Sequence, residues 1–309
     1  MIGRYVLIKV ARSLLTLWLI VTFSFVVLAT TGDPLDALVG DDAPQEVIDQ
    51  YAQRYGFDRP LHEQYFKYLK AVATFDFGIS YSDETSVADL ILEALPKTLE
   101  LGLTALCGGL LLGVGLGVLA AIKRNTAVDR FVMGFAVFGF SIPNFFFGIL
   151  LILLFSLQLR LLPSAGSDSL AHLILPAVTL GTSMAGAFAR FTRSAVLEVL
   201  GKTYMHAAHA RGIAARARLF RHALPNAAIP LVTILGLRLG DVVAGAIVTE
   251  SVFAWPGLGR LLVNAVSARE LAVVMGTLIF AATSIILANL TVDLLYGWID
   301  PRMRSSRRV

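Results

Sequence analysis

Six long apolar stretches constrain the fold of this 309-residue chain more than any other feature of its sequence. A transmembrane helix needs about 20 mostly apolar residues to cross roughly 30 Å of hydrocarbon. The stretches that meet or approach this length are residues 14–30, 101–122, 131–159, 173–189, about 226–248 and 271–292. The fifth is interrupted by Arg238 and Asp241, and the other five carry no charge. We therefore predict an all-α, polytopic membrane protein with six transmembrane helices.

The composition excludes both a soluble globule and a disordered chain. Hydrophobic residues make up 56% of the sequence and charged residues 16%, whereas roughly a quarter of the residues are charged in soluble domains. A chain this apolar gains free energy by collapsing, so it does not stay disordered in water. The single cysteine, Cys107, lies within an apolar stretch. We expect a buried, inert thiol there, without redox or metal chemistry.

Lysine and arginine gather in every second segment between the apolar stretches. Three lie before the first stretch, three within residues 123–130, seven within residues 190–222 and four in the C-terminal tail. With six spans these segments fall on one side of the membrane and hold 17 of the 26 basic residues. Cytoplasmic loops carry an excess of Lys and Arg, so we predict that this side and both termini are cytoplasmic. Because the basic residues follow topology, no nucleic-acid partner is predicted.

The segment of residues 31–98 is the sizeable polar part of the sequence. Its thirteen acidic and five basic residues fit an external position. Apolar residues recur three and four positions apart over residues 61–73, which predicts a helix. We interpret the segment as a small helical cap, and a passive spacer is the alternative. The predicted organisation is a cytoplasmic segment and first span over 1–30, an external segment over 31–98, and a five-span core over 99–309.

Neither nucleotide-hydrolysing nor metal-dependent chemistry is indicated. Gly201, Lys202 and Thr203 resemble the end of a phosphate-binding loop, but the earlier glycine that such a loop requires falls at Val196. The five histidines include no HExxH pair. We predict no catalytic residue and no metal site, and therefore a protein that is not an enzyme.

Arg238 and Asp241 are charged residues inside a predicted span. Because they lie three positions apart, they share a helical face and can neutralise each other. A charge at bilayer depth is costly, so such residues serve a purpose there. Two interpretations stay open: the pair lines a polar translocation path, or it forms a structural ion pair where two helices meet.

Two further features interrupt or follow the apolar stretches. Pro143 and Asn144 predict a kink in the third stretch, which either lines a cavity or is an ordinary structural kink. Phe253, Trp255 and Pro256 follow the fifth stretch, where aromatic rings favour the membrane interface.

Residues 204–225 form the most informative segment of the chain. An Ala-rich turn, a glycine at position 212 and a second basic turn predict a short helix, a bend and another short helix. Retention on the cytoplasmic side and contact with anionic lipid would also explain its basic character.

This segment resembles the EAA loop of ABC-importer permeases, whose pattern is E-A-A, three residues, G, nine residues, I, one residue and L-P. The matching residues are Ala207, Ala208, Gly212, Leu224 and Pro225. Histidine replaces the Glu at position 206 and the Ile at position 222. A polar or basic residue in the first position is typical of the peptide and nickel branch of these permeases.

The resemblance to that branch continues over almost the whole chain. The further motifs are Gly-Asp-Pro at 32–34, DFGIS at 76–80, TLEL at 98–101, SIPNF at 141–145, RFTRS at 190–194, TESVFAWPGLGR at 249–260, VDLLY at 292–296 and Asp-Pro-Arg at 300–302. In this order they resemble the first of two permease subunits of a dipeptide, oligopeptide or nickel importer.

The resemblance implies a type I permease fold in a bacterial inner membrane, with cytoplasmic coupling helices between spans four and five. It implies a second permease subunit, two ATPase subunits and a periplasmic substrate-binding protein as partners. No cofactor is then bound by this chain, because the ATPase subunits bind ATP and Mg. The residues expected to contact the ATPase are Tyr204, His206, Ala207, Ala208, Arg211, Gly212, Leu224 and Pro225. At Phe253, Trp255 and Pro256 the resemblance implies a re-entrant helix or an external gate.

The substrate is left open by these motifs. Peptides are favoured over nickel, because the spans offer no soft or imidazole ligands at membrane depth. Glutathione and metal chelates are alternatives, and a self-sufficient secondary carrier or channel, or a scaffold without transport, are hypotheses of a different class.

The predicted topology can be tested by cysteine labelling in a Cys107→Ala background. A cysteine placed at Asp41 should be labelled by a membrane-impermeant reagent from the external side only, because six spans then gather the basic segments in the cytoplasm. A cysteine placed at Arg216 is the control and should be labelled from the cytoplasmic side only. Selective labelling at position 41 from the cytoplasmic side would contradict the assignment.

Overall fold

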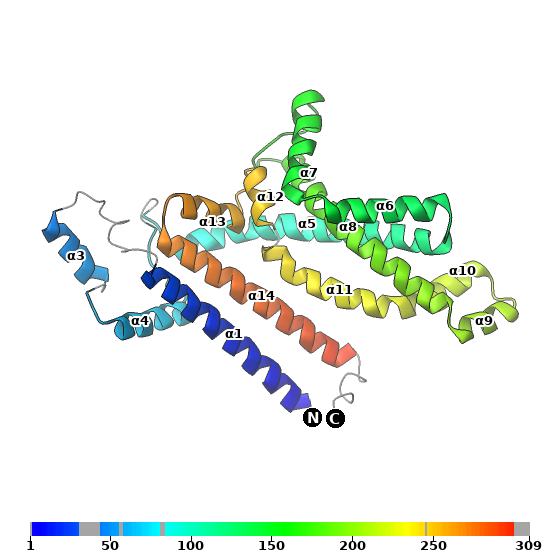
Figure 1. The fold of residues 1–309 in the computed structure, drawn as a ribbon, viewed down its shortest axis with the longest axis horizontal. Coiled ribbons are helices and arrows are strands. Elements are labelled where there is room, and N and C mark those ends of the chain that lie inside the picture. The colour runs from blue at the N-terminus through cyan, green and yellow to red at the C-terminus, as the bar shows by residue number, and fades with distance from the viewer. Residues whose placement is uncertain (1, 31–43, 56–57, 81–83, 245, 300–309) are drawn as a thin grey trace. The chain divides into compact units, whose positions relative to one another are not determined.

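The computed structural model describes the chain except for residues 1, 31–43, 56–57, 81–83, 245 and 300–309. Regular structure in the described ranges is helical apart from an isolated antiparallel bridge between Ile79 and Ser86. The helices are α1 (Ile2–Thr30), α3 (Gln45–Tyr55), α4 (Leu61–Thr74), α5 (Val87–Ile122), α6 (Ala127–Ser141), α7 (Asn144–Leu151), the π-helix η1 (Ile152–Gln158), α8 (Leu170–Leu200), α9 (Thr203–Ala210), α10 (Ala215–Ala217), the π-helix η2 (Arg218–Ala223), α11 (Leu224–Ala244), α12 (Ile247–Val252), α13 (Leu258–Ser267) and α14 (Leu271–Ile299) (Figure 1). The predicted all-α membrane fold is confirmed.

Four described helices are each long and apolar enough to cross a membrane. They contain the segments Val6–Val27, Val87–Ile122, Leu170–Leu200 and Leu271–Thr291. Two further candidates are pairs of helices joined at a bend, Ala127–Ser141 with Asn144–Gln158 and Ala215–Ala228 with Pro230–Gly240. The count reaches six if each bent pair is one span. The six-span topology therefore stays a prediction.

The third predicted span is not one helix. The axes of α6 and of the α7–η1 segment differ by 105°, which is far sharper than the kink that Pro143 alone predicts. Ile142 has φ −83° and ψ 126°, an extended conformation that ends α6. A residue before proline is pushed out of the α-helical region by its contact with the proline ring. The chain therefore breaks sharply where the sequence predicts a kink, and the crossing of the membrane by residues 131–159 as one span stays a prediction.

The fifth predicted stretch, about residues 226–248, is also divided. Helix α11 ends at Ala244, and α12 begins at Ile247 with a separate direction (Figure 1). The C-terminal part of this stretch thus belongs to a short helix and not to the span.

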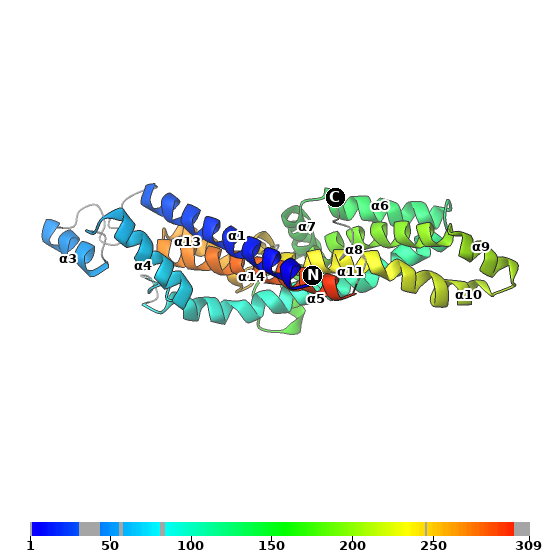
Figure 2. The same cartoon turned by 90° about the horizontal axis from the view of Figure 1, so that it is seen from below.

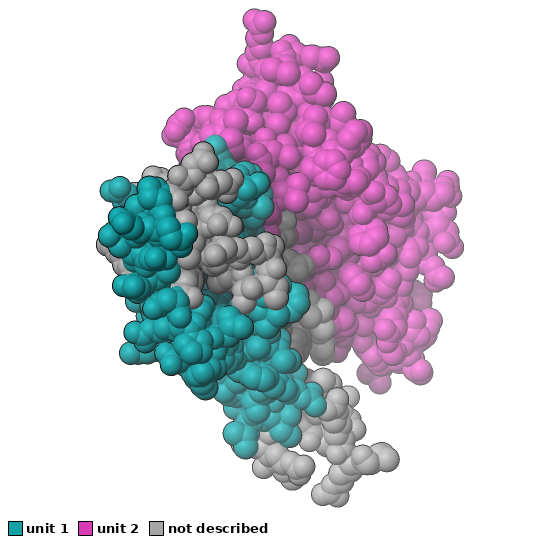
Figure 3. Space-filling model, turned by 60° about the vertical axis from the view of Figure 1, so that its left-hand side comes forward, with its two compact units in different colours: residues 1–97, 256–309 teal, residues 98–255 magenta. Residues whose placement is uncertain are grey.

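The chain forms two compact units, residues 1–97 with 256–309 and residues 98–255 (Figure 3). We call them unit 1 and unit 2. Helix α5 contributes its first turns to unit 1 and its longer apolar part to unit 2. The units follow packing, whereas the segments 1–30, 31–98 and 99–309 were defined by the side of the membrane. That assignment to sides stays a prediction.

Unit 1 contains an antiparallel pair of α1 and α14, which places the start of α1 and the end of α14 at the same end (Figures 1 and 2). Helix α4 packs on α1, where Thr22 and Tyr65 share a hydrogen bond of 2.8 Å between their hydroxyl groups. The ring of Phe25 lies 5.2 Å from that of Tyr65 and 5.6 Å from that of Tyr68. Burial raises the pKa of Tyr68 to about 12. The predicted helix at residues 61–73 is confirmed, and it packs on a span as a cap would.

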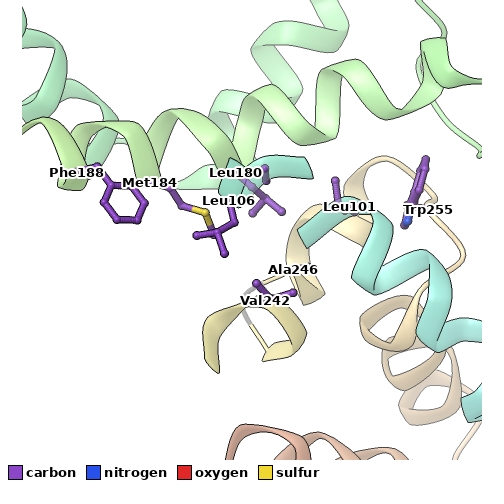
Figure 4. Packing of buried hydrophobic residues seen from close by; sticks show 9 residues of the cluster. Leu101, Leu106, Leu180, Met184, Phe188, Val242, Ala246 and Trp255 are labelled. Carbon is purple, nitrogen blue, oxygen red and sulfur yellow. The ribbon is translucent and has the colours of Figure 1, made fainter. Parts of the chain in front are cut away.

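Unit 2 is built around α8, which packs against α5, α6 and α11. A core cluster joins α5, α8, the end of α11 and the turn after α12, and the labelled side chains in Figure 4 are Leu101, Leu106, Leu180, Met184, Phe188, Val242, Ala246 and Trp255. Trp255 and Phe188 are among the largest fully buried side chains of the described chain.

Helices α5 and α8 approach through glycines spaced four residues apart. A Cβ atom built on Gly109, Gly113 or Gly117 would lie 2.8, 2.6 or 2.5 Å from the nearest atom of α8. For Gly113 and Gly117 these atoms are the backbone oxygens of Ala185 and Ala189. Lipid-embedded helices gain no hydrophobic free energy from meeting, so small residues that allow close backbone packing stabilise their contact.

Cys107 lies on the exposed face of α5, so the expectation of a buried thiol was wrong. The buried stripe follows Ala105, Gly109 and Gly113, which recur at helical spacing. Position 107 lies about 200° around the helix from both 105 and 109. An apolar stretch alone does not reveal which of its faces is covered.

We predict that Gly113→Ala lowers the free energy of unfolding by about 1–3 kcal/mol, because the new methyl group forces α5 and α8 apart. The matched control is Gly115→Ala on the same helix, where no atom lies within 4 Å of a built Cβ. Alanine forms helix better than glycine, so this control should be neutral or stabilising by up to about 1 kcal/mol. Denaturant titration of both purified variants in detergent checks the prediction, and equal effects would contradict it.

Candidate functional site

The segment after α8 folds as a short helix, a glycine turn and a second short helix. Helix α9 ends at Ala210, and Gly212 has φ +76°. The amide of Ile213 donates to the carbonyl oxygen of Ala208 at 3.2 Å, and that of Gly212 donates to His209 at 2.9 Å. These two bonds form a Schellman motif, which requires a left-handed residue at the glycine position. The predicted helix, bend and helix are confirmed.

One side chain anchors α9 to the rest of unit 2. Met205 is the buried residue of this helix, and it packs in a cluster with Val196, Val199, Ala223 and Ala227. These partners come from the end of α8, from η2 and from α11. The short helix is thus held at one end of α8 by apolar contacts.

Most of the other residues expected to contact the ATPase are exposed to solvent. Tyr204, His206, Ala207, Arg211 and Gly212 are exposed. Ala208 and Leu224 are half-buried, and Pro225 is exposed at the start of α11. The structure therefore groups the residues of α9 on one accessible surface, while Leu224 packs inward against the anchoring cluster.

The charge around this surface is positive. Lys202 forms an ion pair of 2.8 Å with Glu198, and this hydrogen bond raises the pKa of Lys202. The Arg216 guanidinium lies 6.0 Å from the ring centre of the exposed Phe220. The α5–α6 turn, with its own basic residues, lies at the same end of unit 2 (Figures 1 and 2).

An ion pair fixes the start of α6 to α8 near this end. Arg193 donates from Nε and Nη2 to the two carboxylate oxygens of Asp129, at 2.6 and 2.8 Å. The backbone amide of Asn125 also donates to Asp129 at 2.9 Å. Paired donors in this geometry give a strong and directional contact. Arg193 belongs to the basic segment of residues 190–222, and the structure places it within α8, which continues to Leu200.

Two of the three expected gate residues lie in the protein core, and the third, Pro256, is exposed. Phe253 and Trp255 are 2% and 1% exposed. Phe253 packs with Leu151 of α7 and Leu175 of α8, and its carbonyl oxygen accepts a hydrogen bond from the Gly166 amide at 3.0 Å. Anchoring at the membrane interface therefore does not account for either ring. The chain after α11 turns back into unit 2 through the short helix α12, which buries these side chains.

A buried hydrogen bond missed by the sequence analysis ties α12 to α5. The Thr98 hydroxyl donates to Glu250 Oε1 at 2.7 Å, and both side chains are 0% exposed. The two residues lie in the motifs TLEL and TESVFAWPGLGR, but no pattern in either motif indicates its partner. Trp255 follows Glu250 closely, and its backbone amide donates to the Glu250 carbonyl oxygen at 2.8 Å.

Of the residues expected to line the translocation path, the structure describes the side chains of Pro143, Asn144 and Arg238. Asn144 begins α7 directly after the break at Pro143 and is half-buried. Arg238 is half-buried on α11. The side chain of Asp241 lies outside the described residues, so its pairing with Arg238 stays a prediction. In the described parts of the chain, no three His, Cys, Asp or Glu residues are grouped so that they could hold a metal ion.

These features define a class of protein: a helical membrane permease with broken spans. At one end of unit 2 it carries an accessible basic segment made of the short helix α9, the turn at Gly212 and the short helix α10. Residues 113–305 match the family described as "Binding-protein-dependent transport system inner membrane component", and residues 1–102 match its N-terminal family. The chain belongs to this family of transport permeases. It is a transmembrane permease subunit of an ABC importer, as the EAA-like segment predicted.

Curated relatives cover nearly the whole chain. The "Glutathione transport system permease protein GsiC" of Escherichia coli strain K12 is 40% identical over 302 residues, which cover 97% of this chain and 99% of that protein. The protein of the same name from Salmonella paratyphi A is also 40% identical over 302 residues, with the same coverage.

A solved structure shares the fold. It is titled "Inward facing conformations of the MetNI methionine ABC transporter", and the comparison gives a TM-score of 0.56 over 68% of this chain and 96% of that chain. The sequences are 20% identical. This similarity supports the type I permease fold and nothing about the substrate.

We predict that Thr98→Val lowers the free energy of unfolding by about 1–3 kcal/mol. Valine keeps the volume of threonine but removes the hydroxyl that donates to the buried Glu250 carboxylate. Thr98→Ser is the matched control: it keeps the donor and loses one methyl group, which costs about 1 kcal/mol. The unfolding transitions of the two purified variants should separate in this order. A Thr98→Val protein as stable as the wild type would show that this hydrogen bond contributes nothing.

Proposed function

We propose that this chain is one of two permease subunits of an ATP-driven importer of small peptides, with glutathione as the leading substrate. The observation that carries the proposal is the 40% identity to glutathione permeases over 302 residues, with no large part of either chain unmatched. Glutathione is itself a tripeptide, so this substrate lies within the peptide class that the sequence motifs favour.

The partners follow from this function. A second permease subunit completes the translocation path, two ATPase subunits bind on the cytoplasmic side, and a periplasmic binding protein delivers the substrate. ATP and Mg belong to the ATPase subunits. The chain lies in a bacterial inner membrane with both termini in the cytoplasm. The shared end of α1 and α14 supports this placement of the termini.

The exposed surface of α9 is the contact with the ATPase. It combines small side chains at Ala207, which is exposed, and Ala208, which is half-buried, with a turn at Gly212. Such a helix can settle closely into a groove of a partner protein. Met205 holds the helix on α8, so movement of the ATPase would be passed directly to a span. Coupling also requires that the contact differs in energy between two conformations of the transporter.

We predict that Gly212→Glu and Ala208→Trp leave membrane insertion intact and abolish ATP-dependent uptake of glutathione. At position 212 any side chain strains a backbone with φ +76°, at about 1–2 kcal/mol. At position 208 the indole ring obstructs docking. The measurements are co-purification of the ATPase with each variant and uptake of labelled glutathione into vesicles that contain the assembled transporter and its binding protein.

Two controls separate the loss of this contact from a general effect of added bulk and from weaker binding to lipid. Ala127→Trp places the same bulk on an exposed residue at the same end of unit 2 and should leave uptake unchanged. Replacing Arg216, Arg218 and Arg221 by Gln tests retention by anionic lipid, which predicts a larger loss than the neutral-site variants. Normal ATPase recovery and uptake in both Gly212→Glu and Ala208→Trp would remove the coupling role. Absence of glutathione uptake by the wild-type transporter would refute the substrate.

A further inference from the structure

The segment that follows α9 carries positive charge that this chain does not neutralise. No Asp or Glu occurs in residues 199–240. Among the described residues, the four arginines that follow α9 form no ion pair. We call these four the basic cluster: Arg211, Arg216, Arg218 and Arg221.

Two carboxylates near this end of unit 2 bind other cations. Glu198 forms an ion pair of 2.8 Å with Lys202. Asp129 binds Arg193 through both of its oxygens, at 2.6 and 2.8 Å. The basic cluster is therefore left for a negatively charged group of another molecule.

Arg218 carries a hydrogen-bond donor that lacks an acceptor. Its side chain is half-buried, and its Nε is buried without a hydrogen-bond partner in the described chain. Arg193 shows how such a donor is used, because its Nε and Nη2 hold the two oxygens of Asp129. Arg218 has the same planar fork of donors. Buried polar groups in folded proteins are nearly always paired, so this donor indicates an acceptor from outside the chain.

An exposed aromatic ring lies within the basic cluster. Leu219 and Ala223 pack with Met205 on the inner side of η2, whereas Phe220 is 57% exposed. The Arg216 guanidinium lies 6.0 Å from the centre of the Phe220 ring. A guanidinium held against the face of a ring can still donate from its edge. Aromatic and arginine side chains are enriched where proteins contact one another, which favours a protein as the partner.

In the proposed topology the basic cluster lies beyond the lipid headgroups. Helix α8 has 31 residues, and about 20 residues cross the hydrocarbon. Counted from Leu170, the hydrocarbon ends near position 190, and the end of α8 lies about 15 Å further. The headgroup layer takes up about 5–8 Å of this distance. Ala223 packs in one cluster with Val196, and Arg218 is at the opposite end of η2 from α11, so lipid does not cover it.

We propose that the basic cluster binds carboxylates of the ATPase subunit that receives α9. Helix α9 packs against η2, so both lie at the same contact. Arg218 binds one carboxylate through its planar fork of donors, and Arg216 and Arg221 attract further carboxylates at the edge of the contact. Because His206 replaces the glutamate of the EAA pattern, the permease side is positive and the ATPase side is negative. The inference rests on the proposed function and names the chemistry of the partner at the coupling surface.

The test is a titration of purified ATPase subunits onto the two-permease complex in nanodiscs of phosphatidylcholine, at low and at high salt. We expect Arg218→Gln to weaken binding about tenfold at low salt, since it removes a charged hydrogen-bond donor. Arg218→Lys keeps the charge without the planar fork and should fall between Arg218→Gln and the wild type. Wild-type binding should weaken as salt rises, because ions screen the attraction, and Arg218→Gln should depend less on salt.

Arg160→Gln is the matched control. It removes an exposed positive charge that follows η1, outside the basic cluster, and should leave binding and its salt dependence unchanged. Recovery of each two-permease complex shows that the variants fold and assemble. Equal binding by the wild type and Arg218→Gln at every salt concentration would overturn the inference.

Two further outcomes are separated by the same titration. If Arg218→Gln loses binding only in nanodiscs that contain phosphatidylglycerol, the basic cluster binds anionic lipid and the inference is wrong. Gly212→Glu and Ala208→Trp test the proposed coupling contact independently, and their loss should exceed that of Arg218→Gln. Loss of binding in these two variants together with normal binding by Arg218→Gln would refute the role of the basic cluster and leave the contact at α9 standing.

Discussion

Close backbone contact between α5 and α8 is the interaction on which unit 2 depends. Helix α5 meets α8 at Gly109, Gly113 and Gly117. At each of these positions a Cβ atom would lie within 3.0 Å of an atom of α8, so only glycine fits without a shift. Lipid chains are as apolar as leucine, so two helices in a bilayer gain stability from packing and not from leaving water. The same device recurs between α6 and α8, where Gly186 faces the Ala136 backbone. Helix α8 is therefore held on two sides by contacts that tolerate no added methyl group.

Buried polar groups in each unit are paired across long distances in the sequence. Thr98 contacts Glu250 in unit 2, and Ser80 donates to the buried Glu270 at 2.6 Å in unit 1. A buried carboxylate is tolerated where donors satisfy it, and removing the donor leaves a costly group behind. The first pair joins α12 to α5, and the second joins the segment before α5 to the residue that precedes α14. These bonds specify which segments meet, which apolar packing alone does not do.

The sequence predicted four long apolar helices, the helix of residues 61–73 and the turn at Gly212, because each depends on local properties: hydrophobic length, helical periodicity and backbone freedom. It predicted a kink at Pro143 but not the angle of 105°, since a proline limits its neighbour's conformation without determining the direction that the next helix takes. The burial of Phe253 and the exposure of Cys107 depend on which face of a segment meets another segment. The partners Thr98 and Glu250 lie 152 residues apart, beyond the reach of any local pattern.

Helix α8 connects the α9 end of unit 2 with the clusters that hold Phe253 and Trp255. Near its start, Leu175 and Leu180 pack in the clusters that hold Phe253 and Trp255. At its end, Val196 and Val199 hold Met205 of the proposed coupling helix. Helix α11 makes a second connection, since Ala227 belongs to the Met205 cluster and Val242 to the Trp255 cluster. Densely packed cores deform little, so α8 and α11 would transmit a displacement of α9 as shifts of whole helices. If the ATPase contact is at α9, such shifts would reach the packing around the buried aromatic residues that follow α12.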